Sequence, residues 1–181
     1  PILSTMGFQV CPLPTAVLSP HTQYPEFSFL DLTEETKKII EKWEKLHIKF
    51  DTFYCGYLGS AQQAQIVQSF IQRFRRPTDL VVTDPVLGDN GHLYTGITEE
   101  MVREMRQLIR HADIITPNLT ELFLLLDKPH QTSLSDAELK TYLKELSDAG
   151  PEIVIVTSVP VCDNPHMTSV YAYNRNGNRY W

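Results

Sequence analysis

The sequence predicts one α/β domain built around a mostly parallel central sheet. Short apolar runs rich in Val and Ile alternate along the chain with longer segments of helical periodicity. Continuous apolar strands of this kind are typical of parallel sheets that are buried on both faces. Near the C-terminus, two segments of alternating polarity flank Asn176-Gly177, a dipeptide that favours a tight hairpin turn. We therefore expect a three-layer α/β/α sandwich over residues 1–181, with a β-hairpin at the C-terminal edge of its sheet.

The expected strands are short and mostly separated by helices. They cover residues 8–13, 50–55, 80–83, 113–116, 153–156, 169–174 and 179–181. Four helices should begin at residues whose side chains can accept a bond from a backbone N–H, namely Thr33, Ser60, Thr98 and Ser135. A further short helix should begin at about Leu119. Residues 15–31 are mixed and polar, so we expect a loop or a short β excursion there, which can form a flap or lid.

Composition and charge exclude several classes of protein. The 181 residues carry a net charge of -6, which argues against nucleic acid or an anionic membrane as the main partner. No apolar run reaches the about 18 residues of a membrane helix. The three cysteines are widely spaced and odd in number. We expect them to be small core residues in a reducing compartment rather than a disulfide framework or a zinc site.

Small, hydroxylated or acidic residues follow four successive predicted strands. These segments are Gly56-Tyr57, Thr83-Asp84, Thr116-Pro117-Asn118 and Thr157-Ser158. In open parallel sheets, ligands bind outside the carboxyl ends of the strands. The series therefore predicts a ligand site at this edge of the sheet, although polar loops begin at strand ends in any α/β domain.

The segment from Asp84 to Asp89 holds the most informative pair of acids. Asp84 follows a buried apolar strand, where a lone carboxylate needs a cation or several hydrogen-bond donors nearby. Asp89 lies in a glycine-flanked loop five residues later. Two acids in such a place can hold Mg²⁺, directly or through water, beside phosphate groups. The alternative is a helix-capping Asp84 and a turn-forming Asp89.

The remaining candidates each allow a structural interpretation as well. Asn118 and Glu121 share one face of a helix start, so Glu121 can reach the water shell of a metal ion, or the two can form a capping box. Thr157 and Ser158 can bond phosphate oxygens or a monovalent cation, or simply begin a loop. Tyr57 lies between two glycines, Gly56 and Gly59, at a strand end, where an aromatic ring can face a planar ligand.

In order along nearly the whole chain, these segments resemble pyridoxal kinases of the ribokinase-like superfamily. The segments are Ser19-Pro20-His21-Thr22-Gln23-Tyr24, Gly56-Tyr57-Leu58-Gly59-Ser60, Asp84-Pro85-Val86-Leu87-Gly88-Asp89, Thr116-Pro117-Asn118-Leu119-Thr120-Glu121 and Val156-Thr157-Ser158. The third and fourth are shared with hydroxymethylpyrimidine kinases, whereas the first two point to the pyridoxal branch. The resemblance implies a ribokinase-like fold and ATP-dependent phosphorylation of the 5′-hydroxymethyl group of pyridoxal.

The resemblance also implies a role for each candidate residue. ATP phosphates and Mg²⁺ are expected near Asp84, Asp89, Asn118 and Glu121, and a potassium-type ion near Asp84, Thr116 and Thr157, with Thr157 and Ser158 also touching phosphate. Thr22 and Tyr57 are expected to line the pyridoxal pocket, and His21 to lie in the lid above it. Kinases of this family are homodimers in the cytoplasm, so we expect the same here.

Two departures from the family pattern qualify this expectation. The family begins with a strand, a substrate-binding loop and a helix, and residues 1–7 resemble only the end of that helix, with Gly7 as its C-cap. The family also carries a Gly-Thr-Gly-Asp element that supplies an anion hole and the catalytic base, but no Gly-x-Gly occurs among the eight glycines here. No catalytic base is therefore expected within residues 1–181. Alternatives are a hydroxymethylpyrimidine kinase and an incomplete fragment that only binds ligand.

Overall fold

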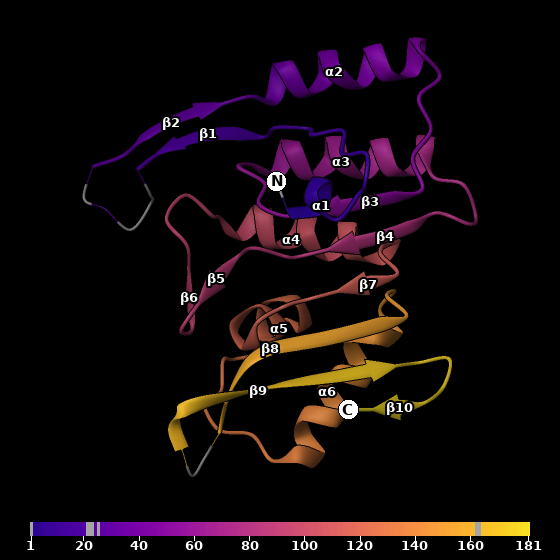
Figure 1. Ribbon diagram of the computed structural model, residues 1–181. Helices are drawn as coiled ribbons and strands as arrows, with labels where there is room; N and C mark the ends of the chain where they lie inside the picture. The colour runs from indigo at the N-terminus through magenta and orange to yellow at the C-terminus, as the bar shows by residue number, and fades with distance from the viewer. Residues whose placement is uncertain (1, 21–23, 25, 162–163) are drawn as a thin grey trace. The chain divides into compact units, whose positions relative to one another are not determined.

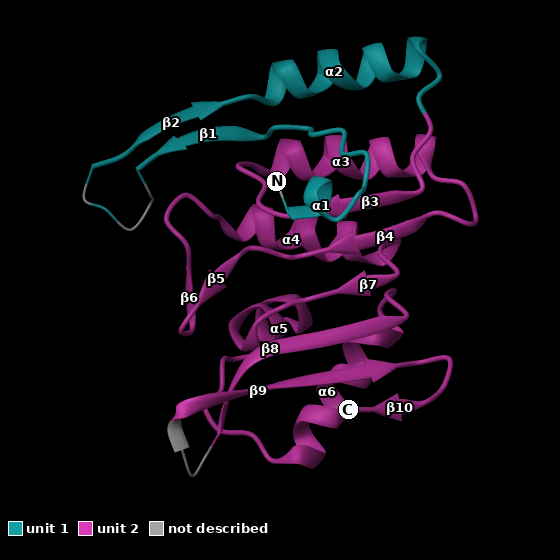
Figure 2. Cartoon of the chain, viewed as in Figure 1, with its two compact units in different colours: residues 1–48 teal, residues 49–181 magenta. Residues whose placement is uncertain are grey.

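The computed structural model describes residues 2–20, 24, 26–161 and 164–181 (Figure 1). The chain forms two compact units, unit 1 over residues 1–48 and unit 2 over residues 49–181 (Figure 2). The described helices are short, and none of them is long and apolar enough to cross a membrane.

Unit 1 contains a β-hairpin between two helices. Its elements are α1 (Ile2–Thr5), β1 (Ala16–Ser19), β2 (Ser28–Asp31) and α2 (Thr33–Lys45). Strands β1 and β2 pair antiparallel, which confirms the short β excursion predicted for residues 15–31. The strand predicted for residues 8–13 is wrong, because these residues form no ladder. Pro12 and Pro14 have no N–H to donate to a neighbouring strand, and this favours an irregular course.

Local chemistry sets the C-terminal end of α1 and the N-terminal end of α2. Gly7 follows α1 with φ +93°, so it is the C-cap that the sequence predicts. Thr33 is the first residue of α2 and not its cap, since its N–H donates to Asp31 Oδ1 at 2.7 Å. The acid two residues earlier thus takes the capping role that the sequence assigns to Thr33.

The sheet of unit 2 is parallel except at one edge. It consists of β3 (Thr52–Cys55), β4 (Leu80–Thr83), β7 (Ile114–Ile115), β8 (Ile153–Val161), β9 (Asn164–Asn174) and β10 (Arg179–Tyr180), in the order β10-β9-β8-β7-β4-β3. Strands β3, β4, β7 and β8 are parallel, whereas β9 and β10 are antiparallel to their neighbours. This confirms the mostly parallel sheet and the hairpin around Asn176-Gly177.

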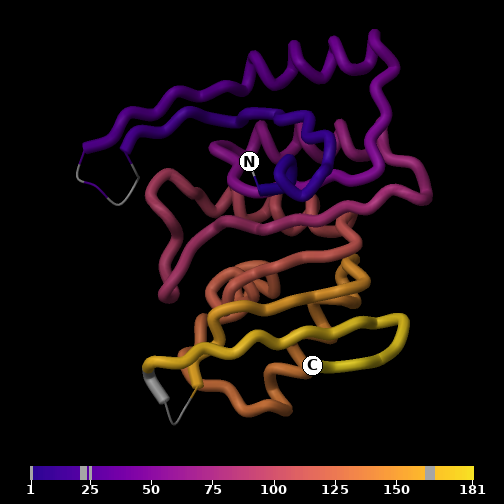
Figure 3. The backbone as a smooth tube through the Cα atoms, in the orientation of Figure 1, coloured from indigo at the N-terminus to yellow at the C-terminus, as the bar shows by residue number. Residues whose placement is uncertain are grey.

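The helices of unit 2 form a single layer. They are α3 (Ala61–Phe74), α4 (Glu99–Leu108) with the 3₁₀ turn η1 (Ile109–His111), α5 (Leu119–Leu126) and α6 (Asp136–Asp148). Side-chain oxygens of Ser60, Thr98 and Ser135 cap α3, α4 and α6 as predicted. Each helix contacts the next, and the tube view shows the row behind the sheet (Figure 3). Right-handed crossovers that always advance in one direction place successive helices on one face.

Burial differs between the two faces of this sheet. Val81, Ile115 and Val154 point toward the helices and are fully buried. On the opposite face Tyr54 is 62% exposed, and Ile114 is half-buried. The mixed α/β fold with a mostly parallel sheet is thus confirmed. The described helices of unit 2 form one of the two helical layers that the sequence predicts.

Strand β8 is longer than the sequence suggests. The sequence predicts an end at Val156, but the strand runs to Val161 because β9 pairs with it again from Val159 to Val161. A shift of register between Val156 and Val159 leaves Thr157 and Ser158 in a bulge. Ser158 lies in this bulge with φ +57°, a left-handed conformation that is uncommon for a residue other than glycine.

The described cysteines have different environments. Cys55 is buried at the end of β3, as expected of a core residue. Cys11 is exposed, so the same expectation is wrong there. The apolar run around Cys11 contains no strand that would draw it into a core, and Cys162 lies outside the described residues.

Candidate functional site

Parallel pairing brings the predicted site residues of unit 2 to one edge of the sheet. The backbone ladder continues past each strand end, through bonds from Asp84 N to Cys55 O at 2.8 Å and from Thr116 N to Thr83 O at 3.1 Å. Thr157 N similarly donates to Pro117 O at 2.9 Å. Asp84, Thr116 and Thr157 therefore follow one another along the carboxyl edge, where ligands of parallel sheets bind.

Asp84 is a half-buried carboxylate at the end of β4. The Thr116 hydroxyl from the neighbouring strand hydrogen-bonds to it, which favours the charged form. Burial outweighs this bond and raises the pKa of Asp84 above its ordinary value. Burial, followed by the charge of Asp84, also raises the pKa of the Cys55 thiol to about 12. Cys55 is thus a neutral thiol beside the site.

Glu121 is a buried carboxylate that links two segments of the site. Its Oε2 accepts the N–H of Asn118 at 2.8 Å, and Asn118 Oδ1 accepts the N–H of Glu121 at 2.9 Å. This capping box is the structural alternative that the spacing allows. In addition, Oε1 accepts the N–H of Leu87 at 3.0 Å, across a separation of 34 residues. Glu121 therefore ties α5 to the segment that begins at Asp84.

The ionisation of Glu121 is shifted further than that of Asp84. Burial raises the pKa of Glu121 to about 7, and the nearby charge of Asp84 acts in the same direction. Bonds from the backbone N–H groups of Asn118, Leu87 and Gly88 oppose this shift. A buried acid and a half-buried acid whose pKa values are both raised mark a place where a cation is stabilised.

Asp89 lies in a two-residue β-hairpin, in a segment whose composition predicts only a glycine-rich loop. Strands β5 (Gly88–Asp89) and β6 (His92–Leu93) pair antiparallel. Asn90 and Gly91 connect them with φ +51° and +77°, the signature of a type I′ turn. Asp89 is exposed, and its Oδ1 accepts the N–H of Asn90 at 2.8 Å. The Asn-Gly pair is the signal in the sequence that could have identified this hairpin.

Three further candidate residues of unit 2 are Thr157, Ser158 and Tyr57. Thr157 forms an isolated parallel bridge with Asn118, whereas Ser158 is exposed in the bulge of β8. Tyr57 is half-buried two residues beyond β3. His21 and Thr22 lie outside the described residues.

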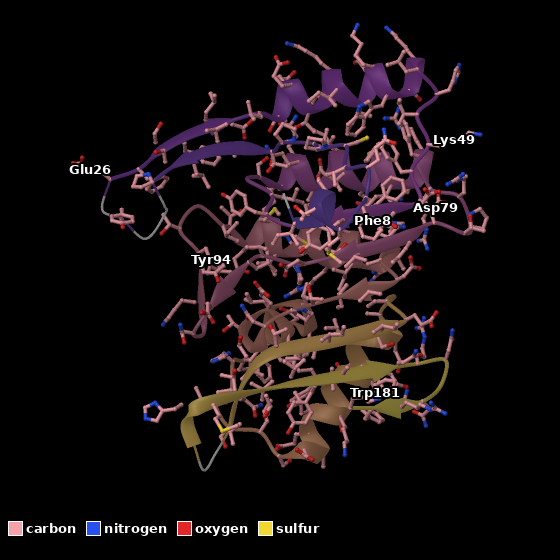
Figure 4. The ribbon with its side chains drawn as sticks, viewed as in Figure 1. Phe8, Glu26, Lys49, Asp79, Tyr94 and Trp181 are labelled. Atoms are coloured by element: carbon pink, nitrogen blue, oxygen red, sulfur yellow. The ribbon has the colours of Figure 1, made fainter. Side chains whose placement is uncertain are left out.

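The acids at the two ends of the sheet differ in their partners. At the amino end, Asp79 binds Arg76 and Asp113 binds Arg75, and the Arg76 guanidinium lowers the pKa of Asp79. Figure 4 shows Asp79 at the opposite end of the sheet from Tyr94, which follows β6. Burial and the charges of Asp89, Glu121 and Asp84 raise the pKa of the Tyr94 phenol. Negative charge is thus neutralised at the amino end and accumulates at the carboxyl end.

This accumulation fits a divalent cation that shares its coordination with a ligand. Among the described ion pairs, none includes Asp84, Asp89 or Glu121. In the same part of the chain no three His, Cys, Asp or Glu side chains lie close enough to hold a metal by themselves. Mg²⁺ is commonly held by one or two carboxylates together with water and substrate phosphates. The residues present fit that arrangement, and would not fit an all-protein metal cage.

Two polar residues of this region, Thr83 and Thr120, lie in segments that the sequence marks as part of the site, but the sequence assigns no role to either of them. Thr120 is 3% exposed, and its hydroxyl accepts the N–H of Gly91 at 2.9 Å. Thr83 is fully buried, and its hydroxyl has no partner among the described residues. Neither environment has a local sequence signal, because each depends on which segments become neighbours in the fold.

The raised pKa of Glu121 predicts how stability changes with pH. In the unfolded chain Glu121 releases its proton near pH 4.5, but the folded protein retains it up to about pH 7. The free energy of unfolding of the ligand-free protein should therefore fall as pH rises through this window, and level off above it. The expected loss is about 3 kcal/mol. Urea unfolding at several pH values measures it, and Glu121→Gln should remove most of the slope.

A second capping box provides the matched control. Glu138 closes the box at the start of α6, but bonds from Ser135 lower its pKa. Its stabilisation is present above its ordinary pKa and is lost as pH falls. Glu138→Gln should consequently leave the slope between pH 4.5 and 7 in place. An unchanged slope in Glu121→Gln would show that the raised pKa has been assigned to the wrong group.

Comparisons with known proteins point to one family. Residues 33–179 match the family model described as phosphomethylpyrimidine kinase. The pyridoxal kinase of Arabidopsis thaliana is 31% identical over 167 residues, which cover 88% of this chain and 52% of that protein. The pyridoxal kinase PdxY of Actinobacillus pleuropneumoniae serotype 5b (strain L20) is 35% identical over 128 residues, covering 66% and 44% of the two chains. The chain thus spans about half the length of the curated relatives it matches.

Solved structures agree with this result. A Bacteroides thetaiotaomicron VPI-5482 protein, assigned to the phosphomethylpyrimidine kinases and crystallised with pyridoxal, is 68% identical with a TM-score of 0.97. The match covers 99% of this chain and 63% of that one. The pyridoxal kinase of Lactobacillus plantarum is 30% identical with a TM-score of 0.86, again covering 99% and 63%. The fold is therefore ribokinase-like. Because the family match extends over residues 33–179, the chain belongs to the phosphomethylpyrimidine kinase family.

Proposed function

We propose that this chain forms the nucleotide- and substrate-binding part of an ATP-dependent pyridoxal kinase, and that both units belong to one kinase domain. The observation that carries the proposal is the pair of acids at the carboxyl edge of the parallel sheet, the half-buried Asp84 and the buried Glu121, neither of which belongs to an ion pair among the described residues. Such a pair favours a phosphate ligand that arrives with a cation, as ATP does with Mg²⁺. The likeness to a protein crystallised with pyridoxal supports the choice of the second substrate.

The proposed roles follow from the position of each residue. Asp84 and Glu121 would hold Mg²⁺ directly or through water, with Asp89 and Asn118 beside the ATP phosphates. When bound, Mg²⁺ supplies charge neutralisation for the transferred phosphoryl group. A potassium-type ion would lie near Asp84, Thr116 and Thr157, since the Thr116 hydroxyl contacts Asp84 and Thr157 bridges to Asn118. Thr157 and Ser158 would contact phosphate oxygens at the bulge.

The acceptor alcohol would bind beyond the end of β3. Tyr57 would face the pyridine ring, Thr22 would bond its substituents, and His21 would belong to the lid. The resemblance assigns the catalytic base to a Gly-Thr-Gly-Asp element, which does not occur in this sequence. Residues 1–181 would therefore bind, orient and stabilise charge, without taking the proton from the hydroxymethyl group. Assembly as a homodimer and a cytoplasmic location complete the proposal.

A hydroxymethylpyrimidine kinase is the second candidate, favoured by the description of the family model. The full-length protein should be assayed for ATP-dependent phosphorylation of pyridoxal and of hydroxymethylpyrimidine, with Mg²⁺ and with K⁺ or Na⁺. We expect a higher kcat/KM for pyridoxal, loss of turnover on chelation of Mg²⁺, and faster turnover in K⁺. A higher kcat/KM for hydroxymethylpyrimidine would support the second candidate. No phosphorylation of either alcohol would exclude both.

A further inference from the structure

The first turn of α5 holds the β5–β6 hairpin at three points. The contacts run from Glu121 Oε1 to Leu87 N at 3.0 Å, from Asn118 Nδ2 to Gly88 O at 2.8 Å, and from Thr120 Oγ1 to Gly91 N at 2.9 Å. The first two contacts hold Leu87 and Gly88, where the chain enters the hairpin. The contact of Thr120 alone reaches the turn itself.

Thr120 is suited to fix this turn in one position. It lies in the first turn of α5 and is 3% exposed, so water competes little for its hydroxyl. Its partner Gly91 has φ +77° and is the second residue of the type I′ turn. An amide N–H in a buried contact is costly to leave without an acceptor. Loss of the hydroxyl should therefore shift the turn toward solvent.

A ring supports the same turn from another direction. A Cβ atom built on Gly91 would lie 2.9 Å from Cδ2 of His130, so the glycine backbone packs directly against that imidazole. The His130 ring in turn contacts Phe123 of α5 edge-on, with ring centroids 5.6 Å apart. The turn is thus held between the Thr120 hydroxyl, which belongs to α5, and the His130 ring, which packs against Phe123 of α5.

Asp89 immediately precedes this turn, and both of its carboxylate oxygens accept hydrogen bonds from Asn90, the first residue of the turn. Its Oδ1 accepts the N–H of Asn90 at 2.8 Å, and its Oδ2 accepts from Asn90 Nδ2 at 3.2 Å. We infer that Thr120 is a positioning residue, which places the Asp89 carboxylate toward cation-bound nucleotide phosphates through the Asn90-Gly91 turn. This inference rests on the proposed function, because it takes the nucleotide as the ligand of Asp89.

The test uses the full-length protein with Thr120→Val, Thr120→Ser and the control Thr141→Val. Valine keeps the shape of threonine and replaces the hydroxyl with a methyl group, whereas serine retains the hydroxyl. Thr141 makes its hydroxyl bond to Ala137 O on the exposed side of α6, away from the hairpin. We measure the KM for ATP with Mg²⁺, the KM for pyridoxal, and the hydrogen exchange of the Gly91 amide.

We expect Thr120→Val to raise the KM for ATP about 10-fold while the KM for pyridoxal stays within twofold. Exchange of the Gly91 amide should accelerate in this variant alone. Thr120→Ser should restore both values, and Thr141→Val should match the wild type. In the background Asp89→Ala, Thr120→Val should have no further effect on the KM for ATP, because the two changes act through the same carboxylate.

Other results would overturn the inference in recognisable ways. An unchanged KM for ATP in Thr120→Val, with wild-type nucleotide binding intact, would exclude the positioning role. Equal increases of both KM values together with a lower Tm would show that Thr120 only stabilises the fold. A wild-type protein that binds neither ATP nor ADP would instead refute the proposed function, and the inference with it.

Discussion

Asp84→Asn should lower the kcat/KM for ATP of the full-length protein by about 100-fold, and this is the largest effect on activity that we expect. The asparagine retains the shape and can still accept the bond from Thr116, so the change removes mainly the negative charge. That charge is stabilised by no ion pair among the described residues. Under the proposed function it acts on Mg²⁺ and the transferred phosphoryl group.

Stability should change in the opposite direction. Since burial raises the pKa of Asp84, its ionised form is less favourable in the folded state than in the unfolded chain. The ligand-free Asp84→Asn protein should consequently have a Tm equal to or above that of the wild type at pH 8. The increase in Tm caused by ATP with Mg²⁺ should be lost. A site that carries charge for function and not for folding shows this combination.

Asp148→Asn is a suitable comparison. Asp148 ends α6 and pairs with Lys144 at 2.8 Å, with half of each side chain exposed. Exposed pairs of this type contribute little to stability, and this one lies away from the carboxyl edge. We expect wild-type kinetics from this variant. If Asp84→Asn also retained wild-type kcat/KM, the metal and phosphate assignment at β4 would have to be abandoned.

The parts of the fold that are predictable from sequence depend on local chemistry. Ser60, Thr98 and Ser135 each accept a backbone N–H three residues later, so a short window of sequence suffices to locate the helix start. The buried parallel strands carry continuous Val and Ile runs for the same reason. Their shared carboxyl edge then follows from parallel order alone, which is why sequence patterns suffice to bring Asp84 and Thr116 together.

The sequence-based predictions of strands are wrong where a distant segment decides the local structure. Strand β8 extends to Val161 because β9 runs antiparallel along it, and the bulge at Thr157 is a consequence of that pairing. Residues 8–13 have strand-like composition, but Pro12 and Pro14 weaken any ladder. A pattern of polarity reports how a segment can pair, but not whether a partner is present.

For Glu121, residue spacing alone does not decide between a structural and a functional role. A spacing of three residues from Asn118 is equally compatible with a capping box and with a metal-linked acid, and the structure contains the capping box. Its bond to Leu87, 34 residues away, has no trace in the sequence. The Asn90-Gly91 turn is the reverse case, since a recognisable dipeptide marks a hairpin within a segment whose glycine content suggests only a loop.

Gly88→Ala should destabilise the protein by about 2–3 kcal/mol. A Cβ atom at Gly88 would overlap the backbone oxygen of His92, and would lie 3.0 Å from Cα of Leu93. Both contacts are with backbone atoms of the paired strand β6, so no side-chain rotation can relieve them. The hairpin would have to open, and the bond from Asn118 Nδ2 to Gly88 O would be strained at the same time. Urea unfolding of the ligand-free protein measures the loss.

Gly56→Ala separates this clash from the general effect of adding a methyl group. The nearest atom to a Cβ at Gly56 is Cε1 of the Tyr54 ring at 3.8 Å, an ordinary van der Waals contact. We expect a change below about 1 kcal/mol there, because Gly56 needs no left-handed backbone conformation. Equal midpoints for the two variants would mean that β5 and β6 are not paired as described. Weaker nucleotide binding by Gly88→Ala alone would connect the pairing of this hairpin directly to the site, because Asp89 is the next residue.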